Sequence, residues 1–165
     1  MTAWSQVTLN QVPSRIVGHP IPEQFTIKSS SPNLVEGREF FSPQGIALDT
    51  SVTPPILYVA DSGNNRVLAW KNATAFRNGQ PADLVIGQPD MFTTGPQGPG
   101  IGLQTGLFNP FGLAVRPNGD LWVVDGGNNR VLKYPKPFSQ SDQFPTQVIG
   151  QPNLTSRTPN NCVGT

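Results

Sequence analysis

The stretch VADSGNNRVLAW, Val59–Trp70, returns 64 residues later as VVDGGNNRVLKY, Val123–Tyr134. In both copies an apolar run ends in Asp, a short segment of Gly and Asn follows, and a second apolar run begins at Arg. Gly and Asn favour turns, and an Asp at the head of a turn accepts hydrogen bonds from the backbone amides that follow it. We therefore interpret the phrase as a β-hairpin that is built twice, and not as a catalytic motif.

Two further landmarks recur around this phrase in the same order. PQGIA precedes the first copy and PFGLA the second, while LVIGQPD and QVIGQPN follow them, which predicts units of about 65 residues. Each unit is expected to contain four short strands, and Asn118-Gly119 to form a two-residue hairpin turn with positive φ angles. In the second unit the predicted strands are Phe111–Arg116, Asp120–Asp125, Arg130–Tyr134 and Thr146–Gly150.

The composition and the apolar runs predict an all-β fold. Seventeen Gly and 18 Pro in 165 residues are typical of many short strands joined by turns. The runs ILYVA and LWVVD are apolar at successive positions, which predicts that both faces of each sheet are buried. Four antiparallel strands buried on both faces and repeated in tandem are typical of the blades of a β-propeller.

At these residues the sequence resembles the NHL repeat family of β-propellers, and the VIGQP landmark resembles a bacterial subgroup. The resemblance implies about two blades of a six-bladed ring, although units of about 65 residues exceed the forty-odd typical of the family. The surplus lies in long connectors. The repeated motif, interpreted as structural, consists of Pro43, Gly45, Asp61, Gly63, Asn64, Asn65 and Arg66 in the first unit and Pro110, Gly112, Asp125, Gly127, Asn128, Asn129 and Arg130 in the second.

The repeats predict four segments. Residues 1–18 are an N-terminal segment with an orphan outer strand, because SRIVGHP matches the fourth strand of a unit. Residues 19–87 and 88–150 are the first and second blades with their connectors, and 151–165 begin a third connector. We expect the chain to be the N-terminal part of a longer propeller, with head-to-tail self-association as the alternative. Two blades alone would expose large apolar faces.

Charge and hydropathy argue against several classes of partner. The net charge is +1 and the basic residues are scattered, so nucleic-acid binding is not predicted. The sequence has no run of 18 apolar residues, so no membrane span is predicted. Cys162 is the single cysteine, so no disulfide within the chain is possible. No signal peptide is recognisable. The resemblance alone favours an extracytoplasmic or secreted location.

No cofactor and no metal site are predicted. Arg66 and Arg130 are equivalent in the two units, which favours a structural tie over an anion site. Each guanidinium group is expected to join neighbouring strands or blades through carbonyls and carboxylates such as Asp61 and Asp125. The Asp and Asn residues of the turns are expected on turn chemistry without calcium. The resemblance extends to amidating lyases that hold zinc through several histidines, but His19 is the single histidine here. It also extends to lactonases that use Glu, Asn and Asp, a pattern that Glu36 and Glu39 do not form.

The sequence therefore favours a non-enzymatic scaffold that binds a protein or a small ligand through its long loops. The predicted recognition face consists of the connectors Pro20–Ser42 and Gln88–Asn109, with binding residues Phe92, Gln97, Gln104, Glu36 and Arg38. The alternative is part of a propeller enzyme, a metal-dependent lyase or lactonase-like hydrolase whose active site lies in blades outside this chain. A third possibility is an extracellular sensor domain.

Overall fold

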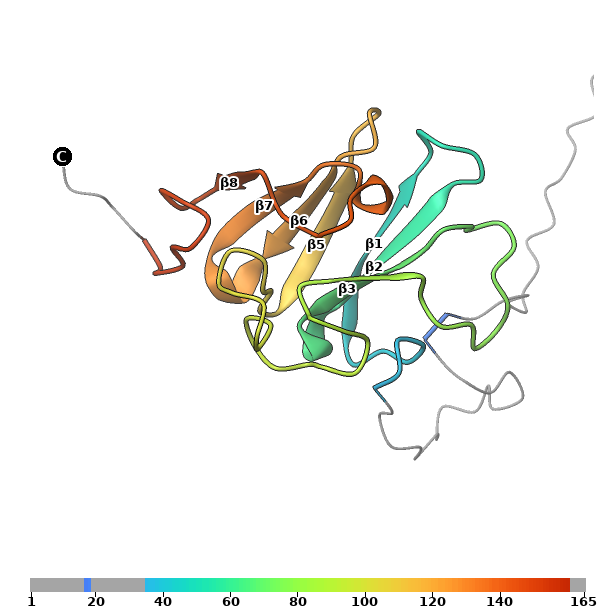
Figure 1. The fold of residues 1–165 in the computed structure, drawn as a ribbon, viewed down its shortest axis with the longest axis horizontal. Helices are drawn as coiled ribbons and strands as arrows, with labels where there is room; N and C mark the ends of the chain where they lie inside the picture. The colour runs from blue at the N-terminus through green and yellow to red at the C-terminus, as the bar shows by residue number, and fades with distance from the viewer. Residues whose placement is uncertain (1–16, 19–34, 161–165) are drawn as a thin grey trace, which may run out of the picture.

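In the part of the chain that the structure describes, residues 17–18 and 35–160, eight strands form two four-stranded antiparallel sheets (Figure 1). The structure is a computed structural model. The first sheet contains β1 (Pro43–Asp49), β2 (Ile56–Asp61), β3 (Arg66–Trp70) and β4 (Leu84–Ile86). The second contains β5 (Pro110–Val115), β6 (Leu121–Asp125), β7 (Arg130–Tyr134) and β8 (Gln147–Ile149). The predicted all-β class is confirmed.

Helical structure within the described residues is confined to three 3₁₀ turns: η1 (Ser62–Asn64), η2 (Gly126–Asn128) and η3 (Pro137–Ser139). None of the helices there has the length and hydropathy needed to cross a membrane.

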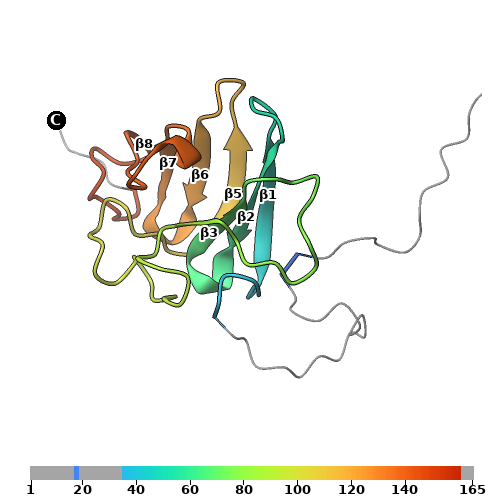
Figure 2. The same ribbon diagram turned by 45° about the vertical axis from the view of Figure 1, so that its right-hand side comes forward.

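The two sheets lie side by side with their first strands, β1 and β5, next to each other (Figures 1 and 2). Strand order in each sheet follows the chain, so β4 and β8 form the far edges. The first strands approach so closely that a Cβ built on Gly45 would lie 2.2 Å from the Phe111 carbonyl oxygen. Gly45, the glycine of the first Pro-x-Gly phrase, is therefore required where the two sheets meet.

The main core lies between the sheets. It combines Ile56, Tyr58, Val67, Ala69 and Ile86 from the first sheet with Leu121, Val123, Leu132 and Tyr134 from the second. A second cluster, of Leu57, Val59, Leu68 and Trp70, occupies the other face of the first sheet. That face is covered by the connectors, and the Phe40 ring meets the Trp70 indole edge-on with centroids 5.8 Å apart. The prediction that both faces of ILYVA are buried is confirmed.

The same prediction is wrong for LWVVD. Along β6 buried and half-buried residues alternate, and Trp122 and Val124 are half-buried. Their side of the second sheet has no covering layer among the described residues. Apolar residues at successive positions therefore indicate only that both faces of a strand can be buried. Whether a face is buried depends on the presence of a neighbouring layer.

The hairpins that the repeated phrase predicts are present. β2 pairs with β3 and β6 with β7, with Asp61 opposite Arg66 and Asp125 opposite Arg130. The turn between β5 and β6 differs from the prediction, because only Gly119 has a positive φ, of 87°. The Gly119 amide donates to the Arg116 carbonyl at 2.8 Å, which closes a type I turn before the left-handed glycine. Pro117 fixes φ at the first turn position and so prevents the two-residue form.

The orphan strand is described only at its end. Gly18 forms an isolated parallel bridge with Glu39, and the rest of that strand lies outside the described residues. The predicted strand boundaries in the second unit agree with the structure to within one residue at each end. The four predicted segments remain a prediction.

Candidate functional site

The carboxylate of Asp61 is fully buried at the end of β2. Its Oδ1 accepts a hydrogen bond from the Phe41 amide at 2.7 Å, and its Oδ2 accepts from Asn64 Nδ2 at 2.9 Å and from Arg66 Nε at 2.7 Å. A buried ion pair is tolerated when the remaining hydrogen-bonding positions are filled as well. Both oxygens of Asp61 are occupied in this way.

This arrangement corrects the expected role of the aspartate. η1 receives no capping hydrogen bond from the Asp61 side chain. The Gly63 amide donates instead to the Phe41 carbonyl at 2.8 Å, so it is not available to the carboxylate. A Cβ on Gly63 would lie 2.4 Å from the Phe41 ring, which explains the glycine by close approach. The positive φ, of 54°, belongs to Asn65.

Arg66 also binds the connectors that precede and follow the first sheet in the chain. Its Nη1 donates to the Met91 carbonyl at 2.5 Å and its Nη2 to the Glu39 carbonyl at 3.3 Å. Together with the Asp61 contact, these bonds engage three different nitrogens of the guanidinium group. They support the structural interpretation of the repeated arginine.

Asn65 and Gln88 hold the connector that follows the first sheet. Asn65 Nδ2 donates to the Thr94 carbonyl at 2.8 Å, and its Oδ1 accepts from the Asn109 amide at 2.8 Å. Gln88 Nε2 donates to the Asn65 carbonyl at 2.9 Å and to the Gly95 carbonyl at 2.8 Å. No role was predicted for Gln88 from the sequence. Its recurrence as Gln151 in the second VIGQP was the pattern that could have indicated this role.

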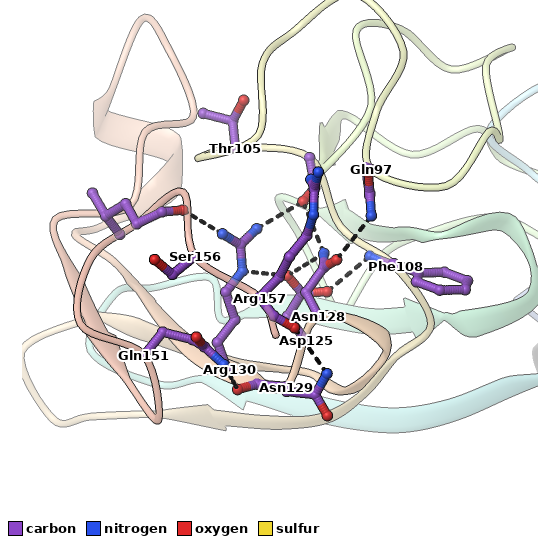
Figure 3. Close-up of polar contacts among 12 residues, drawn as sticks. Gln97, Thr105, Phe108, Asp125, Asn128, Asn129, Arg130, Gln151, Ser156 and Arg157 are labelled. Carbon is purple, nitrogen blue, oxygen red and sulfur yellow. Dashed lines mark hydrogen bonds and ion pairs between the residues drawn. The ribbon is translucent and has the colours of Figure 1, made fainter. Parts of the chain in front are cut away.

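The second unit repeats this network around Asp125 (Figure 3). Asp125 Oδ1 accepts from the Phe108 amide at 2.8 Å, and its Oδ2 accepts from Asn128 Nδ2 at 2.9 Å and Arg130 Nε at 2.7 Å. Burial raises the pKa of Asp125, while the Phe108 amide, Asn128 and Arg130 act in the opposite direction. Arg130 also donates to the carbonyls of Gly106, at 2.9 Å, and Leu154.

The amides of the second unit bind as their counterparts do. Asn129 Nδ2 donates to the Arg157 carbonyl at 3.0 Å (Figure 3), and Gln151 Nε2 donates to the carbonyls of Asn129, at 2.9 Å, and Thr158, at 3.1 Å. The repeat is therefore a device that docks a connector onto its own hairpin.

Phe92 is the most exposed large apolar residue in the described part of the predicted recognition face. It is 70% exposed in the connector after the first sheet, and Asp90 Oδ1 accepts from its amide at 2.9 Å and from the Thr93 amide at 2.7 Å. The hydrogen bonds of the Asp90 side chain with Thr93 and the Phe92 amide lower the pKa of Asp90. Asn153 forms the same turn in the second unit, but Thr155 stands there in place of a phenylalanine.

The other predicted binding residues are less prominent. Gln97 is half-buried and donates to Asn128 Oδ1 at 3.4 Å, and Gln104 is half-buried. Arg38 Nε lies 3.1 Å from Glu36 Oε2, and both side chains are partly exposed. In both views the described parts of the two connectors lie at the same end of the sheets as η1 (Figures 1 and 2).

Glu39 is a buried carboxyl group that sequence reasoning did not assign. It is 7% exposed, and neither of its carboxylate oxygens has a hydrogen-bond partner among the described residues. Burial, and then the charge of Glu36, raise the pKa of Glu39. Its counterpart in the second unit is Gly106, so this acid is not part of the repeated device.

Metal-ligating side chains do not converge in the described part of the chain, where no group of three or more His, Cys, Asp or Glu residues has the placement needed to hold an ion. His19 and Cys162 lie outside that part.

Residues 109–134 match the family model of the NHL repeat. The matched segment runs from just before β5 to the end of β7, and it contains the second Asp-Asn-Arg cluster. A search of curated proteins found no match to the chain. The resemblance predicted from the sequence is thereby confirmed for the repeat family.

Proposed function

We propose that this chain, which carries an NHL repeat, is a non-enzymatic segment of a six-bladed propeller and acts as an interaction or ligand-binding scaffold through the connectors between its sheets. The proposal depends chiefly on Phe92. An apolar ring that remains 70% exposed on a connector otherwise fixed by hydrogen bonds is suited to insertion into a partner.

The rigidity of the connector supports this assignment. Arg66, Asn65 and Gln88 hold its backbone at Met91, Thr94 and Gly95. The loop is therefore ordered before it meets a partner, which lowers the entropy lost on binding. The hydrogen bonds recur in the second unit, but the phenylalanine does not. The fold of the connector therefore does not require Phe92.

The test compares two exposed phenylalanines in the full chain. Phe92→Ala removes the proposed anchor, and Phe144→Ala removes a 50% exposed ring between β7 and β8. Proteins that crosslink to wild type in extracts of the native cells are identified, and their affinity for each purified variant is then measured. We expect Phe92→Ala to weaken binding by about tenfold or more, as for an aromatic hot spot, and Phe144→Ala to leave it unchanged. Equal binding by all three proteins would count against the proposal.

The half-buried outer side of β6 supports the presence of a further blade or a second copy of the chain. Trp122 and Val124 lie there, whereas the corresponding side of the first sheet is buried against the second. Measurement of the mass in solution distinguishes the two arrangements. Self-association predicts a multiple of 17.8 kDa, and completion by further blades predicts that a chain extended by them remains monomeric.

A further inference from the structure

A cavity of about 890 Å³ opens at the end of the sheets opposite the connectors. Four segments line it: the β1–β2 hairpin, the segment after β3, the β5–β6 turn and the segment containing η3. Figures 1 and 2 show the β1–β2 and β5–β6 hairpins projecting side by side at this end. Its volume falls in the range of small-molecule sites, and both sheets contribute to its wall.

The hydroxyl of Tyr58 is a buried donor that finds no partner in the described part of the chain. The Tyr58 side chain is fully buried and lines the cavity, and its hydroxyl forms no hydrogen bond within the described residues. Burial, and then the nearby charge of Asp49, raise the pKa of Tyr58, so the hydroxyl keeps its proton at neutral pH. An unsatisfied buried hydroxyl is costly, which makes it a position that a ligand would fill.

Asp49 supplies an acceptor beside this donor. It is 3% exposed and lines the same cavity, and its Oδ1 accepts from the Ser51 amide at 2.9 Å. Its other oxygen faces the β5–β6 turn, since a Cβ on Gly119 would lie 3.3 Å from Oδ2. A phenol donor and a carboxylate acceptor thus line the same cavity from neighbouring strands.

The pair does not belong to the repeated scaffold. The counterparts of Asp49 and Tyr58 in the second unit are Arg116 and Trp122, whereas the Asp, Asn and Arg residues that dock the connectors are identical in both units. The chemistry of this cavity is therefore specific to the junction between the two sheets.

The charges around the cavity balance. Lys71 and Lys136 line it together with Asp49 and Asp83, so the wall carries no net formal charge. The uncharged part of the wall combines amides and hydroxyls with apolar surface from Phe76, Phe138 and Ile56. This combination favours a neutral molecule that carries both donors and acceptors and has an apolar face.

We propose that this cavity binds a small neutral polyhydroxylated molecule of the size of a mono- or disaccharide. The Tyr58 hydroxyl donates a hydrogen bond to the ligand, the Asp49 carboxylate accepts one from a ligand hydroxyl, and the Phe138 ring provides an apolar wall. The site is independent of the connector face, because it lies at the opposite end of the sheets.

The test titrates the full chain with glucose, galactose, mannose, maltose and cellobiose at millimolar concentrations, followed by heteronuclear NMR. Citrate and spermidine serve as charged probes of similar size. We expect at least one sugar to shift the signals of residues lining the cavity and neither charged probe to do so. If only a charged probe shifts them, or if no sugar does, the proposal is overturned.

Matched tyrosine variants then test the role of the hydroxyl. Tyr58→Phe removes a group without a partner, so it should leave the melting temperature unchanged or raised while it weakens sugar binding about tenfold. Tyr134→Phe is the control, because its hydroxyl lies 3.5 Å from the Thr105 carbonyl and outside the cavity. Asp49→Asn should also weaken binding. Undiminished affinity in Tyr58→Phe would overturn the assignment.

Discussion

The two sheets share one sequence pattern and one set of hydrogen bonds, yet they differ in burial. Every residue of β2 and β3 is buried, whereas buried and half-buried residues alternate along β6 and β7. The first sheet lies between the second sheet and its own connectors, and the second is covered on one side among the described residues. The repeat therefore determines the strands and hairpins of each sheet, and a neighbouring layer is needed to bury both faces.

Removal of the buried aspartate should have the largest effect. In Asp61→Ala the guanidinium group of Arg66 stays buried without its carboxylate, which should cost about 3–5 kcal/mol of the free energy of unfolding. Asp125→Ala should cost less. The hydrogen bonds by which Asn129 and Gln151 hold the connector after β8 are exposed, so water can reach the Arg130 guanidinium group more easily once the carboxylate is removed. Urea denaturation measures both. Partial recovery is expected in Asp61→Ala/Arg66→Met, and equal losses in the two single variants would contradict the ranking.

A valine at the same position of both repeats tests the contribution of the neighbouring layer. Val67 is fully buried against the second sheet, and its counterpart Val131 is half-buried. Val67→Ala should cost about 2–3 kcal/mol, and Val131→Ala about 1 kcal/mol or less. Because the two strands are paired alike, intrinsic strand preference cancels in the difference. Equal costs would show that burial does not distinguish the two sheets.

The two asparagines with left-handed backbone conformation allow the turns of the two units to be compared. Asn65 and Asn129 share a φ of 54°. Among the described residues, the side chain of Asn65 alone of the two also accepts a hydrogen bond from the residue just before the next sheet, through the Asn109 amide. Glycine keeps this backbone conformation accessible. Asn65→Gly should therefore cost about 1 kcal/mol more than Asn129→Gly in thermal unfolding. A reversed order would contradict a stabilising role for the hydrogen bond between Asn65 and Asn109.

The smallest expected effect concerns Glu39, which Gly106 replaces in the second unit. Since burial raises the pKa of Glu39 above its ordinary value of 4.5, the folded state binds a proton that the unfolded state releases as the pH rises. Stability is therefore lost as the pH increases through the raised pKa. Glu39→Gln should raise the melting temperature slightly at neutral pH, and the gain should vanish below about pH 4. A gain that is independent of pH would exclude this cause.

Local features of the fold were predictable because their causes lie within a few residues. The recurrence of the Asp-x-Gly-Asn-Asn-Arg phrase and of its flanking landmarks predicted the hairpins and the boundaries of the second-unit strands. The error at Asn118-Gly119 had a local cause as well, since Pro117 restrains the turn. Of the partners of Asp61, Arg66 was predicted. The Phe41 amide was missed because it lies 20 residues away in the chain.

The candidate sites were predictable to a lesser degree. The connector with Phe92 was predicted as a recognition face from its length and composition. The hydrogen bonds of Gln88 that hold it join residues 7 and 23 positions away and were not predicted. The cavity around Tyr58 and Asp49 was not predicted at all. Its wall combines segments from two sheets, and in the sequence Tyr58 reads as an ordinary core aromatic.

By itself the sequence determined two copies of a four-stranded antiparallel unit, the hairpin between their second and third strands, and the side chains suited to an interior. Propensity, turn chemistry and periodicity act over a few residues, so they can be read along one dimension. The tertiary structure fixes the rest: within the described residues one unit is enclosed and the other is covered on one side, a tyrosine hydroxyl lacks a partner, and balanced charges line one cavity. Those outcomes depend on distances between residues remote in the chain, which are set only when the sheets pack together.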